Sequence, residues 1–479
     1  MLLRMVYDEW LAQAAYLIGC QRTGEAIVID PERDADRYID LADEHGLRIT
    51  AVAETHIHAD FLSGVRELAE RVGARVYVSG EGGTDWRSRW LDMKTGGGRY
   101  RATQLRDGDT FTVGDIEFRT LHTPGHTPEH VSYMVTDRGA DATEPMGIAT
   151  GDFVFVGDLG RPDLLETAAG QEGAKEPAAR QLAASARKFV RLADYLQVWP
   201  AHGAGSACGK ALGAVPQSTV GYEKRFNPAL QLVENEDAFV GYVLEGQPEP
   251  PLYFARMKRD NRDGVALLRE LPRAVELNQR QLGSIDGSRT AVLDTRPWDA
   301  FCAGHIAGAL HTPLKPALPT VAGSYVREDE PIVLIAEHGD AERVVRALVR
   351  IGLDRIEGYA TPATLRALAA SGGAAERTTN IDVSALRERM ARGDVSVLDV
   401  RRATEHAQGR IAGSVNIAHT RLLARLDELP TGKPIAVHCR SGERSSYATS
   451  VLNRLGYEAI NVTGGMLAWE AAQAAVERG

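Results

Sequence analysis

The second half of the chain contains the same sequence frame twice, about 105 residues apart. Residues 292–313 read VLDTRPWDAFCAGHIAGALHTP, and residues 397–418 read VLDVRRATEHAQGRIAGSVNIA. Both copies share Val-Leu-Asp-x-Arg followed by Gly-x-Ile-Ala-Gly. A repeat of this length is a duplicated domain, because solenoid units span only about 20 to 50 residues. We therefore expect two copies of one fold, at residues 276–377 and 378–479.

Short apolar runs alternate with amphipathic helix patterns inside each copy. VLDV at 397–400 and PIAVHC at 434–439 are typical of buried strands, and helix-like segments follow them. This alternation predicts an α/β fold with a parallel sheet in each copy. The first 250 residues differ, because many strand-like runs recur there with helical segments between only some of them. Residues 251–275, which start at the last residue of the turn-rich QPEPP (247–251), are expected to be a linker.

Length and composition restrict the class of protein. The chain has 479 residues, which suggests about three domains at roughly 150 residues each. Hydrophobic residues at 44% and charged residues at 25% are typical of a globular protein. The net charge of −10 argues against nucleic acid as a partner, because phosphates attract basic surfaces. No apolar run reaches the roughly 18 residues of a membrane span, so we expect no membrane partner.

The N-terminus and the cysteines bear on the compartment. Asp8 and Glu9 stand where a signal peptide would have its apolar stretch. Four cysteines in 479 residues do not form a disulfide framework. We therefore expect a cytoplasmic protein in which any functional cysteine is a thiol.

Four motifs in the first 250 residues are rich in histidine and aspartate and follow apolar strand patterns. They read THIHAD (55–60), TPGHTPEH (123–130), TGD (150–152) and WPAHG (199–203). Loops at the ends of a rigid sheet are where α/β and sandwich folds present ligand-binding side chains. Histidine and carboxylate are ordinary metal ligands, so the four motifs together predict a metal site.

These motifs resemble those of the metallo-β-lactamase superfamily, and the resemblance covers about residues 1–250. It implies an αββα fold for that part of the chain. Hydrolases of the superfamily, such as glyoxalase II, carry T-H-x-H-x-D-H and hold two metal ions. Phe61 stands at the position of the last histidine, and phenylalanine cannot bind a metal. We therefore expect one metal ion, since a dinuclear hydrolase needs its second site to activate water.

The motifs are most similar to those of the persulfide dioxygenase branch of the superfamily. That resemblance implies one Fe(II) per chain, held by His56, His126 and Asp152. Two histidines and one carboxylate leave positions on such an iron open for substrate and O2. The residues that would then orient ligands or water are His58, Asp60 and His202.

Two further residues are candidates for substrate binding. Arg161 matches a basic position near the thiol-substrate pocket of the family. Cys208 follows His202 closely enough to lie at the mouth of the pocket, where it could exchange sulfur with a persulfide. The alternatives are an ion pair between Arg161 and Asp163 and an inert, buried Cys208.

The second copy of the repeat contains the loop Cys439-Arg440-Ser441-Gly442-Glu443-Arg444 between a strand pattern and a helix pattern. Such a loop directs backbone N–H groups and the positive end of a helix dipole at one sulfur atom, which favours a thiolate. This loop and the TGGMLAW motif resemble those of rhodanese sulfurtransferases. The resemblance implies that Cys439 accepts a sulfane sulfur atom, with Arg440 and Arg444 in the same catalytic site.

The first copy of the repeat lacks this thiol. Ala336 aligns with Cys439, and Glu337 and Asp340 in its loop would repel anions. We therefore expect a degenerate rhodanese domain with a packing or docking role at 276–377 and an active one at 378–479. Cys302, elsewhere in the first copy, is expected to be structural.

The domain order resembles that of persulfide dioxygenase–rhodanese fusion proteins. It implies an α/β multi-domain protein, with an αββα metallo-β-lactamase fold followed by two rhodanese-like α/β domains with parallel sheets. The implied reaction oxidises a low-molecular-weight thiol persulfide with O2 to sulfite and thiol. Cys439 would transfer sulfur between a persulfide and sulfite, forming or using thiosulfate. Analogy with such enzymes suggests a homo-oligomer.

Two other functions stay open. A zinc-dependent thioesterase of the glyoxalase II type would hydrolyse its substrate without O2, although Phe61 and the sulfurtransferase domains count against it. A non-enzymatic carrier or sensor of sulfane sulfur would use Cys439 alone, although the intact set of predicted metal ligands counts against it. The sequence does not identify the thiol that carries the persulfide.

Overall fold

The computed structural model divides into two compact units, residues 1–270 and 271–479. It describes residues 1–167, 170, 172–210, 212–373 and 375–478. The first unit includes residues 251–270 of the expected linker, and the second includes both repeats. The domain boundaries near residues 250 and 378 stay predictions.

Two mixed sheets of six strands lie at the centre of the first unit. In the first sheet the early strands are antiparallel and the later ones parallel. Its order is β1 (Leu2–Asp8), β2 (Gln13–Cys20), β3 (Glu25–Ile29), β4 (Arg48–Ala53), β5 (Arg75–Ser79) and β6 (Ala102–Leu105). The order of the second is β14 (Ser218–Thr219), β13 (Gln197–Pro200), β10 (Gly147–Gly151), β9 (Val131–Asp137), β8 (Ile116–His122) and β7 (Thr110–Val113).

Strand β2 is buried on both faces and explains the layering of this unit. Tyr16 and Ile18 belong to an apolar cluster shared with Phe118 and Tyr133 of the second sheet. The alternate residue Leu17 belongs to a different cluster, formed with the helices on the outer side. Because side chains alternate along a strand, a strand that is buried at every position must lie between two layers.

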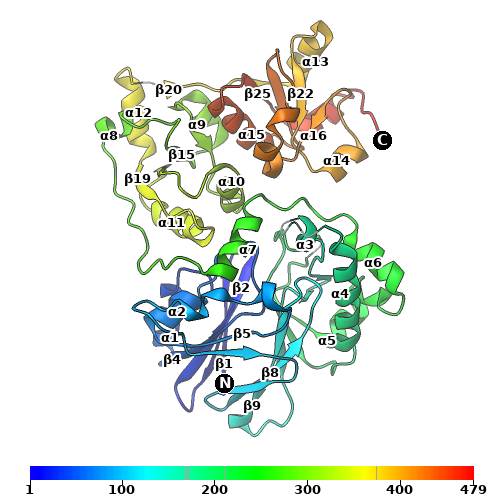
Figure 1. Cartoon of the computed structure of the whole chain (residues 1–479). Coiled ribbons are helices and arrows are strands. Elements are labelled where there is room, and N and C mark those ends of the chain that lie inside the picture. The colour runs from blue at the N-terminus through cyan, green and yellow to red at the C-terminus, as the bar shows by residue number, and fades with distance from the viewer. Residues whose placement is uncertain (168–169, 171, 211, 374, 479) are drawn as a thin grey trace. The chain divides into compact units, whose positions relative to one another are not determined.

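Helices cover the outer faces of the two sheets (Figure 1). Tyr38 of α1 and Leu68 of α2 pack on the first sheet, and Leu182 of α4 and Phe239 of α6 pack on the second. This arrangement confirms the expected αββα fold. The helices are α1 (Asp36–Glu44), α2 (Val65–Arg71), α3 (Leu164–Thr167), α4 (Lys175–Phe189), α5 (Val220–Phe226), α6 (Glu236–Leu244) and α7 (Phe254–Asp263). Shorter elements include η1 (Thr84–Trp86), η2 (Arg89–Asp92), β11 (Val154–Phe155) and β12 (Asp158–Leu159).

The second unit contains two parallel sheets whose four equivalent strands follow the same order, as the repeat predicts, and the second sheet has one additional edge strand. One sheet has the order β17 (Leu310–His311), β15 (Ala291–Asp294), β18 (Ile332–Ile335) and β19 (Ile356–Ala360). The other has the order β21 (Asn380–Ile381), β25 (Ala459–Val462), β24 (Ile435–His438), β22 (Ser396–Asp399) and β23 (Val415–Asn416). Two rhodanese-like domains with parallel sheets are therefore confirmed.

Helices connect the strands of both sheets in the second unit. In the first repeat they are α8 (Gln279–Gly283), α9 (Trp298–Ala303), α10 (Leu318–Tyr325), α11 (Ala341–Arg350) and α12 (Pro362–Ala370). In the second they are α13 (Val383–Arg392), α14 (Ala403–Gln408), α15 (Glu443–Arg454) and α16 (Gly465–Ala471). Ala336 follows β18 as Cys439 follows β24, so the equivalent loop of the first repeat lacks a thiol.

The frame shared by the two repeats forms the same ion pair in each. Arg296 donates to the carboxylate of Asp294 from Nε (2.8 Å) and Nη2 (2.6 Å), and also to the carbonyl of Gly304 (2.8 Å). Arg401 donates to Asp399 in the same way, with a shortest distance of 2.6 Å. A two-point contact between arginine and carboxylate fixes orientation as well as charge. The Asp-x-Arg frame that the two repeats share therefore corresponds to an ion pair at the end of the equivalent strand in each repeat.

Among the residues that the structure describes, no helix combines the length and the apolar character needed to span a bilayer.

Replacing Asp399 by alanine should lower the stability of the second unit. The change leaves the buried guanidinium of Arg401 without its carboxylate, which typically costs about 3 to 5 kcal/mol. Calorimetry of the full chain should show the unfolding transition of this unit at a lower temperature than in the wild type. Asp394→Ala is the matched control, because Asp394 forms an exposed pair with Arg392 and exposed pairs contribute little. If Asp399→Ala and Asp394→Ala lowered the unfolding temperature equally, the structural role of the buried pair would be contradicted.

Candidate functional site

Strands β4, β8, β10 and β13 each end at one of the four histidine- and aspartate-rich motifs. The motifs meet at one edge of the two sheets. Ligand atoms of His56, His126 and Asp152 all lie within 4.8 Å of one another, and all three residues are buried. The structure thus brings the three predicted metal ligands into one group, which we call the metal cluster.

Both imidazoles of the metal cluster present the same nitrogen to Asp152. His126 Nδ1 donates to the carbonyl of Arg161 (3.0 Å), and His56 Nδ1 lies 2.9 Å from Thr55 Oγ1. Their Nε2 atoms lie 3.5 Å and 3.9 Å, respectively, from Asp152 Oδ2. Contacts at Nδ1 orient the ring, so Nε2 is the nitrogen available to a metal.

The chemistry of the metal cluster fits a cation. Within the described part of the chain, His56 Nε2 and both carboxylate oxygens of Asp152 are buried without a hydrogen-bond partner. Burial lowers the pKa of His56 and of His126 well below 6.5, so both rings are neutral and can bind a metal. Burial raises the pKa of Asp152 to about 6. A bound cation would offset the cost of burying this carboxylate.

Asp152 is positioned by His130, for which the sequence suggested no role. The Asp152 N–H donates to His130 Nε2 (3.1 Å), and His130 Nδ1 lies 2.8 Å from Thr123 Oγ1. Gly151 has a φ of +54°, and a Cβ atom there would lie 2.5 Å from Thr55 Oγ1. The turn that presents Asp152 therefore requires glycine.

A second buried group, formed by Asp60, His202 and Cys208, has ligand atoms within 4.8 Å of one another. His202 Nε2 lies 3.3 Å from Asp60 Oδ2 and 3.3 Å from Asp152 Oδ1, so this group adjoins the metal cluster. His202 Nδ1 donates to the carbonyl of Ala12 (3.0 Å). Burial, with the nearby charges of Asp60 and Asp152, raises the pKa of the Cys208 thiol well above its usual value. Cys208 is therefore a protonated thiol beside the metal cluster.

His58 is engaged by Asp30. Its Nε2 lies 3.2 Å from Asp30 Oδ1. Burial opposes the charged form of the ring, yet the carboxylate of Asp30 raises the pKa of His58 to about 9. Phe61 packs against this ring, with centroids 4.4 Å apart. A protonated imidazole has no lone pair for a metal, so neither residue is available as a ligand.

Arg161 joins two parts of the site. Its Nε and Nη2 atoms donate to Asp163 (2.8 Å and 2.6 Å), and Nη1 donates to the carbonyl of Ala207 (3.0 Å). The ion pair with Asp163 is present, and its guanidinium is buried rather than at the surface. Since the carbonyl of Arg161 accepts from His126, the residue links a predicted metal ligand to the loop of Cys208. Its role in substrate binding stays a prediction.

Helix α7 lies in the segment expected to be a linker, yet it covers the 55–60 motif. Asn261 Nδ2 donates to the carbonyls of His58 (2.9 Å) and Phe61 (2.7 Å). Lys258 is buried on the same helix. Sequence reasoning missed both residues, because six of the ten residues of α7 are charged. The spacing of its apolar residues Phe254 and Met257 was the available signal for a buried helix face.

Glu129 is a further buried residue at this site. Its Oε1 accepts from the N–H of Ile57 (2.8 Å), which holds the backbone between His56 and His58. Within the described residues its Oε2 is buried without a hydrogen-bond partner. Burial raises the pKa of this carboxyl group.

Cys439 lies between β24 and α15 and is 1% exposed. The N–H of Gly442 donates to Cys439 Sγ (3.2 Å), and Ser445 Oγ lies 3.6 Å from the same sulfur. The N–H of Met466 donates to the carbonyl of Cys439 (2.8 Å). Gly465 has a φ of +52°, and a Cβ atom there would lie 2.3 Å from this carbonyl oxygen. The glycines of TGGMLAW therefore allow α16 to approach the loop closely.

The two arginines of this loop differ in their surroundings. Arg444 donates from Nη1 and Nη2 to the carboxylate of Glu405 (2.6 Å and 2.8 Å). Arg440 is exposed. The predicted catalytic residues of the second unit thus comprise a buried sulfur, an arginine in an ion pair and an arginine at the surface.

A cavity of about 570 Å³ lies beside the Cys439 loop and is lined by both repeats. Ser441 and Gly442 line it from the second repeat, and Trp298, His311 and Lys315 line it from the first. The first repeat therefore forms one wall of the space next to the Cys439 loop.

Family models match both parts of the chain. The metallo-beta-lactamase superfamily matches residues 8–202, and the rhodanese-like domain matches residues 278–363 and 382–472. The crystal structure of a metallo-beta-lactamase from Staphylococcus aureus subsp. aureus COL is 41% identical, with a TM-score of 0.67. The alignment covers 75% of this chain and 99% of that one. The chain thus belongs to the metallo-β-lactamase superfamily and carries two rhodanese-like domains after its metallo-β-lactamase domain.

Two curated relatives match the first part of the chain. The mitochondrial persulfide dioxygenase ETHE1 of Bos taurus is 27% identical over 235 residues, which are 48% of this chain and 76% of that protein. A beta-lactamase hydrolase-like protein of Agrobacterium fabrum is 29% identical over 256 residues, or 49% of this chain. The match covers 54% of that protein, so the chain spans about half the length of this relative.

Metal affinity should fall as the pH drops below about 6, by about tenfold for each pH unit. The reason is that protons compete for Asp152, whose pKa is about 6 without metal, whereas the two imidazoles are already neutral. Titration of the metal-free protein with a divalent metal at several pH values measures this. His122→Gln is the control and should keep the wild-type profile, because His122 bonds to the carbonyl of Pro128. An Asp152→Asn variant that retained the wild-type profile would contradict the assignment.

Proposed function

We propose that the chain oxidises a low-molecular-weight thiol persulfide with O2 at a single iron ion and transfers sulfur through Cys439. The observation that carries this proposal is the metal cluster: two neutral imidazoles and one buried carboxylate, with ligand atoms within 4.8 Å of one another. Two histidines and one carboxylate are the ligand set of non-haem iron oxygenases. The similarity to the persulfide dioxygenase of Bos taurus over this part of the chain supports the choice of substrate.

The proposed reaction balances without another reductant. A persulfide anion, RSS⁻, reacts with O2 and one water to give the thiol RSH, sulfite and one proton. The sulfane sulfur loses four electrons, and these electrons reduce both atoms of O2. Fe(II), held by His56, His126 and Asp152, would supply the site that binds and activates O2.

The chain's own residues would position the reactants. His130 fixes the backbone of Asp152, and Arg161 fixes both His126 and the loop of Cys208. The contact between Asp60 and His202 can orient a water molecule beside the metal cluster. Cys208 is a buried, protonated thiol next to this contact, and because sulfur exchange requires the thiolate, this favours the alternative of an inert Cys208 over an exchange with the persulfide substrate.

The second unit would carry out the transfer of sulfur. The Cys439 thiolate attacks the outer sulfur of a persulfide RSSH, the bond between the two sulfurs of that persulfide breaks, and the thiol RSH leaves while Cys439 becomes a persulfide. Sulfite then attacks that sulfur, forms thiosulfate and releases the Cys439 thiolate. The Gly442 N–H that donates to Sγ, and the start of α15 just after it, stabilise an anionic sulfur in either direction of the reaction.

A metallo-hydrolase is the second candidate, because Asp60, His202 and Cys208 form another group that could bind an ion. Such an enzyme would contain two metal ions and would cleave a thioester without O2. Phe61 and a protonated His58 at the position of the second site count against it.

The purified protein should contain about one iron per chain and should consume O2 when glutathione persulfide is added. Asp152→Ala should lose both the iron and the O2 uptake, because it removes the one anionic ligand of the metal cluster. Metal analysis and an oxygen electrode on the same sample measure the two quantities. The hydrolase would be favoured instead by two zinc ions per chain and by hydrolysis of S-lactoylglutathione under anaerobic conditions.

Cys439→Ser should abolish thiosulfate formation from a persulfide and sulfite while leaving O2 uptake unchanged. The serine hydroxyl cannot carry a sulfane sulfur, and the metal cluster lies in the other unit. Cys302→Ser is the matched control, because Cys302 accepts a hydrogen bond from Asn380 (3.2 Å) outside the sulfur-binding loop. Loss of both activities in Cys439→Ser would show that the two sites do not act separately.

A further inference from the structure

The ammonium group of Lys258 is buried without a hydrogen-bond partner in the described part of the chain. The residue is 7% exposed, and its Nζ atom lies 4.5 Å from the centroid of the Trp86 ring. A buried charge without a partner is costly, because the protein interior solvates it poorly. The aromatic ring offsets part of this cost through a cation–π contact. The remaining hydrogen-bonding capacity of Lys258 is free for a ligand.

Several contacts place Lys258 beside the 55–60 motif, which contains His56 of the metal cluster. Asn261, one helical turn further along α7, donates to the carbonyls of His58 and Phe61, so this face of the helix covers the 55–60 motif. Trp86, under the ammonium group, packs in an apolar cluster with Ile57, which lies between two histidines of the motif.

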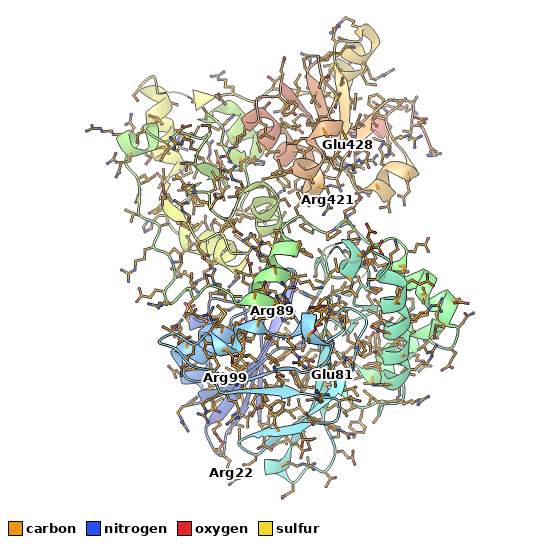
Figure 2. All side chains as sticks on the ribbon, in the orientation of Figure 1. Arg22, Glu81, Arg89, Arg99, Arg421 and Glu428 are labelled. Atoms are coloured by element: carbon orange, nitrogen blue, oxygen red, sulfur yellow. The ribbon has the colours of Figure 1, made fainter. Side chains whose placement is uncertain are left out.

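The position of α7 is fixed from its end as well. Asp263, the last residue of the helix, pairs with Arg89 of η2 at 3.5 Å. Figure 2 labels Arg89 in this part of the first unit. The helix is therefore anchored at two residues that follow Lys258, Asn261 and Asp263, which argues for a fixed ammonium group rather than a mobile surface side chain.

The charges around the metal cluster explain what this ammonium group can bind. Burial lowers the pKa of Lys258 to about 8, while the nearby Glu129 raises it, so the group is mostly charged at neutral pH. The carboxylates of Asp60, Asp152 and Glu129 would all repel an anion that approaches the cluster. The other cations near the site are engaged, since His58 bonds to Asp30 and Arg161 bonds to Asp163.

We propose that Lys258 binds the charged sulfur group of an anionic substrate or product at the metal cluster. The inference rests on the proposed function, in which the substrate RSS⁻ carries one negative charge and the product sulfite carries up to two. The charge on the sulfur group therefore grows during the reaction, and a fixed ammonium group stabilises the product side more than the substrate side. Lys258 also makes the pocket selective for anionic sulfur species over neutral thiols and thioesters.

Binding of sulfite to the iron-loaded protein tests this inference without turnover. Anaerobic calorimetric titration with sodium sulfite should give a Kd about tenfold higher or more in Lys258→Met than in the wild type, because a charge-assisted hydrogen bond is lost. Lys258→Arg keeps the positive charge and should recover most of the affinity. The KM for glutathione persulfide should rise in parallel, with unchanged iron content.

Lys224→Met is the matched control. Lys224 is also partly buried, but it donates to the carbonyl of Leu192 (2.5 Å) and to Asp194 (2.6 Å). This variant should bind sulfite like the wild type. If Lys258→Met does not fold, Lys258→Gln takes its place, since glutamine removes the charge but keeps a polar end group.

The inference is wrong if a folded, iron-loaded neutral variant of Lys258 binds sulfite as tightly as the wild type. The outcome is separable from that of the proposed function. A wild type that consumes no O2 with any persulfide, yet binds sulfite in a Lys258-dependent manner, would refute the dioxygenase and retain the anion site. If the wild type consumes O2 normally and sulfite binding does not depend on Lys258, the dioxygenase is retained and the anion site is refuted.

Discussion

The carboxylate of Asp152 is fully buried between two neutral imidazoles, and much of the first unit serves to hold it there. Its oxygens are 3.3 Å from His202 and 3.5 Å from His126, so it touches both the metal cluster and the group that contains Cys208. Its backbone is fixed by His130 and by the turn at Gly151. A buried anion of this kind is stable only with a cation beside it. The same constraint therefore accounts for the grouping of the predicted metal ligands and for the shape of the turn that presents Asp152.

In the second unit, backbone groups rather than a buried cation surround the atom that can carry a negative charge, the sulfur of Cys439. Its sulfur atom receives a hydrogen bond from the backbone of Gly442 and lies just before the start of α15. No side-chain cation needs to contact the sulfur, because Arg444 is paired with Glu405. Backbone dipoles can stabilise an anion without the flexibility of a long side chain. The loop therefore suits a sulfur atom that changes between thiolate and persulfide.

Most of the architecture could be predicted from the sequence, because short sequence patterns indicate the strands, the helices and the duplicated domain. The repeated Asp-x-Arg frame gave two equivalent domains, and the structure explains it as a buried ion pair in each copy. The four histidine-rich motifs follow strands, and strands of one sheet edge bring their ends together. His56, His126 and Asp152 could be selected by their motifs, whereas the positioning role of His130 depends on a contact across the fold that no local pattern specifies.

What the sequence did not reveal lies in α7. Its residues are mostly charged, so the segment is typical of a solvated linker, and only tertiary packing buries Lys258 and Asn261. Similarly, Asp30 follows β3 and His58 lies in the loop after β4, and these two residues, which are 28 positions apart in the sequence, meet because the two strands pair in the sheet. Whether a polar side chain is buried depends on the residues that pack around it in the folded protein. A local sequence pattern describes only residues that are close in the sequence.

The packing of α7 also determines where this polypeptide can be divided. A fragment that ended at residue 250 would contain every predicted metal ligand and all twelve strands of the two sheets, yet it would lack Asn261 and leave the carbonyls of His58 and Phe61 without their amide donor. A fragment that ended at residue 270 would keep these bonds. The backbone of the 55–60 motif therefore depends on a residue that lies about forty positions beyond Thr219, the end of the last strand of the two sheets.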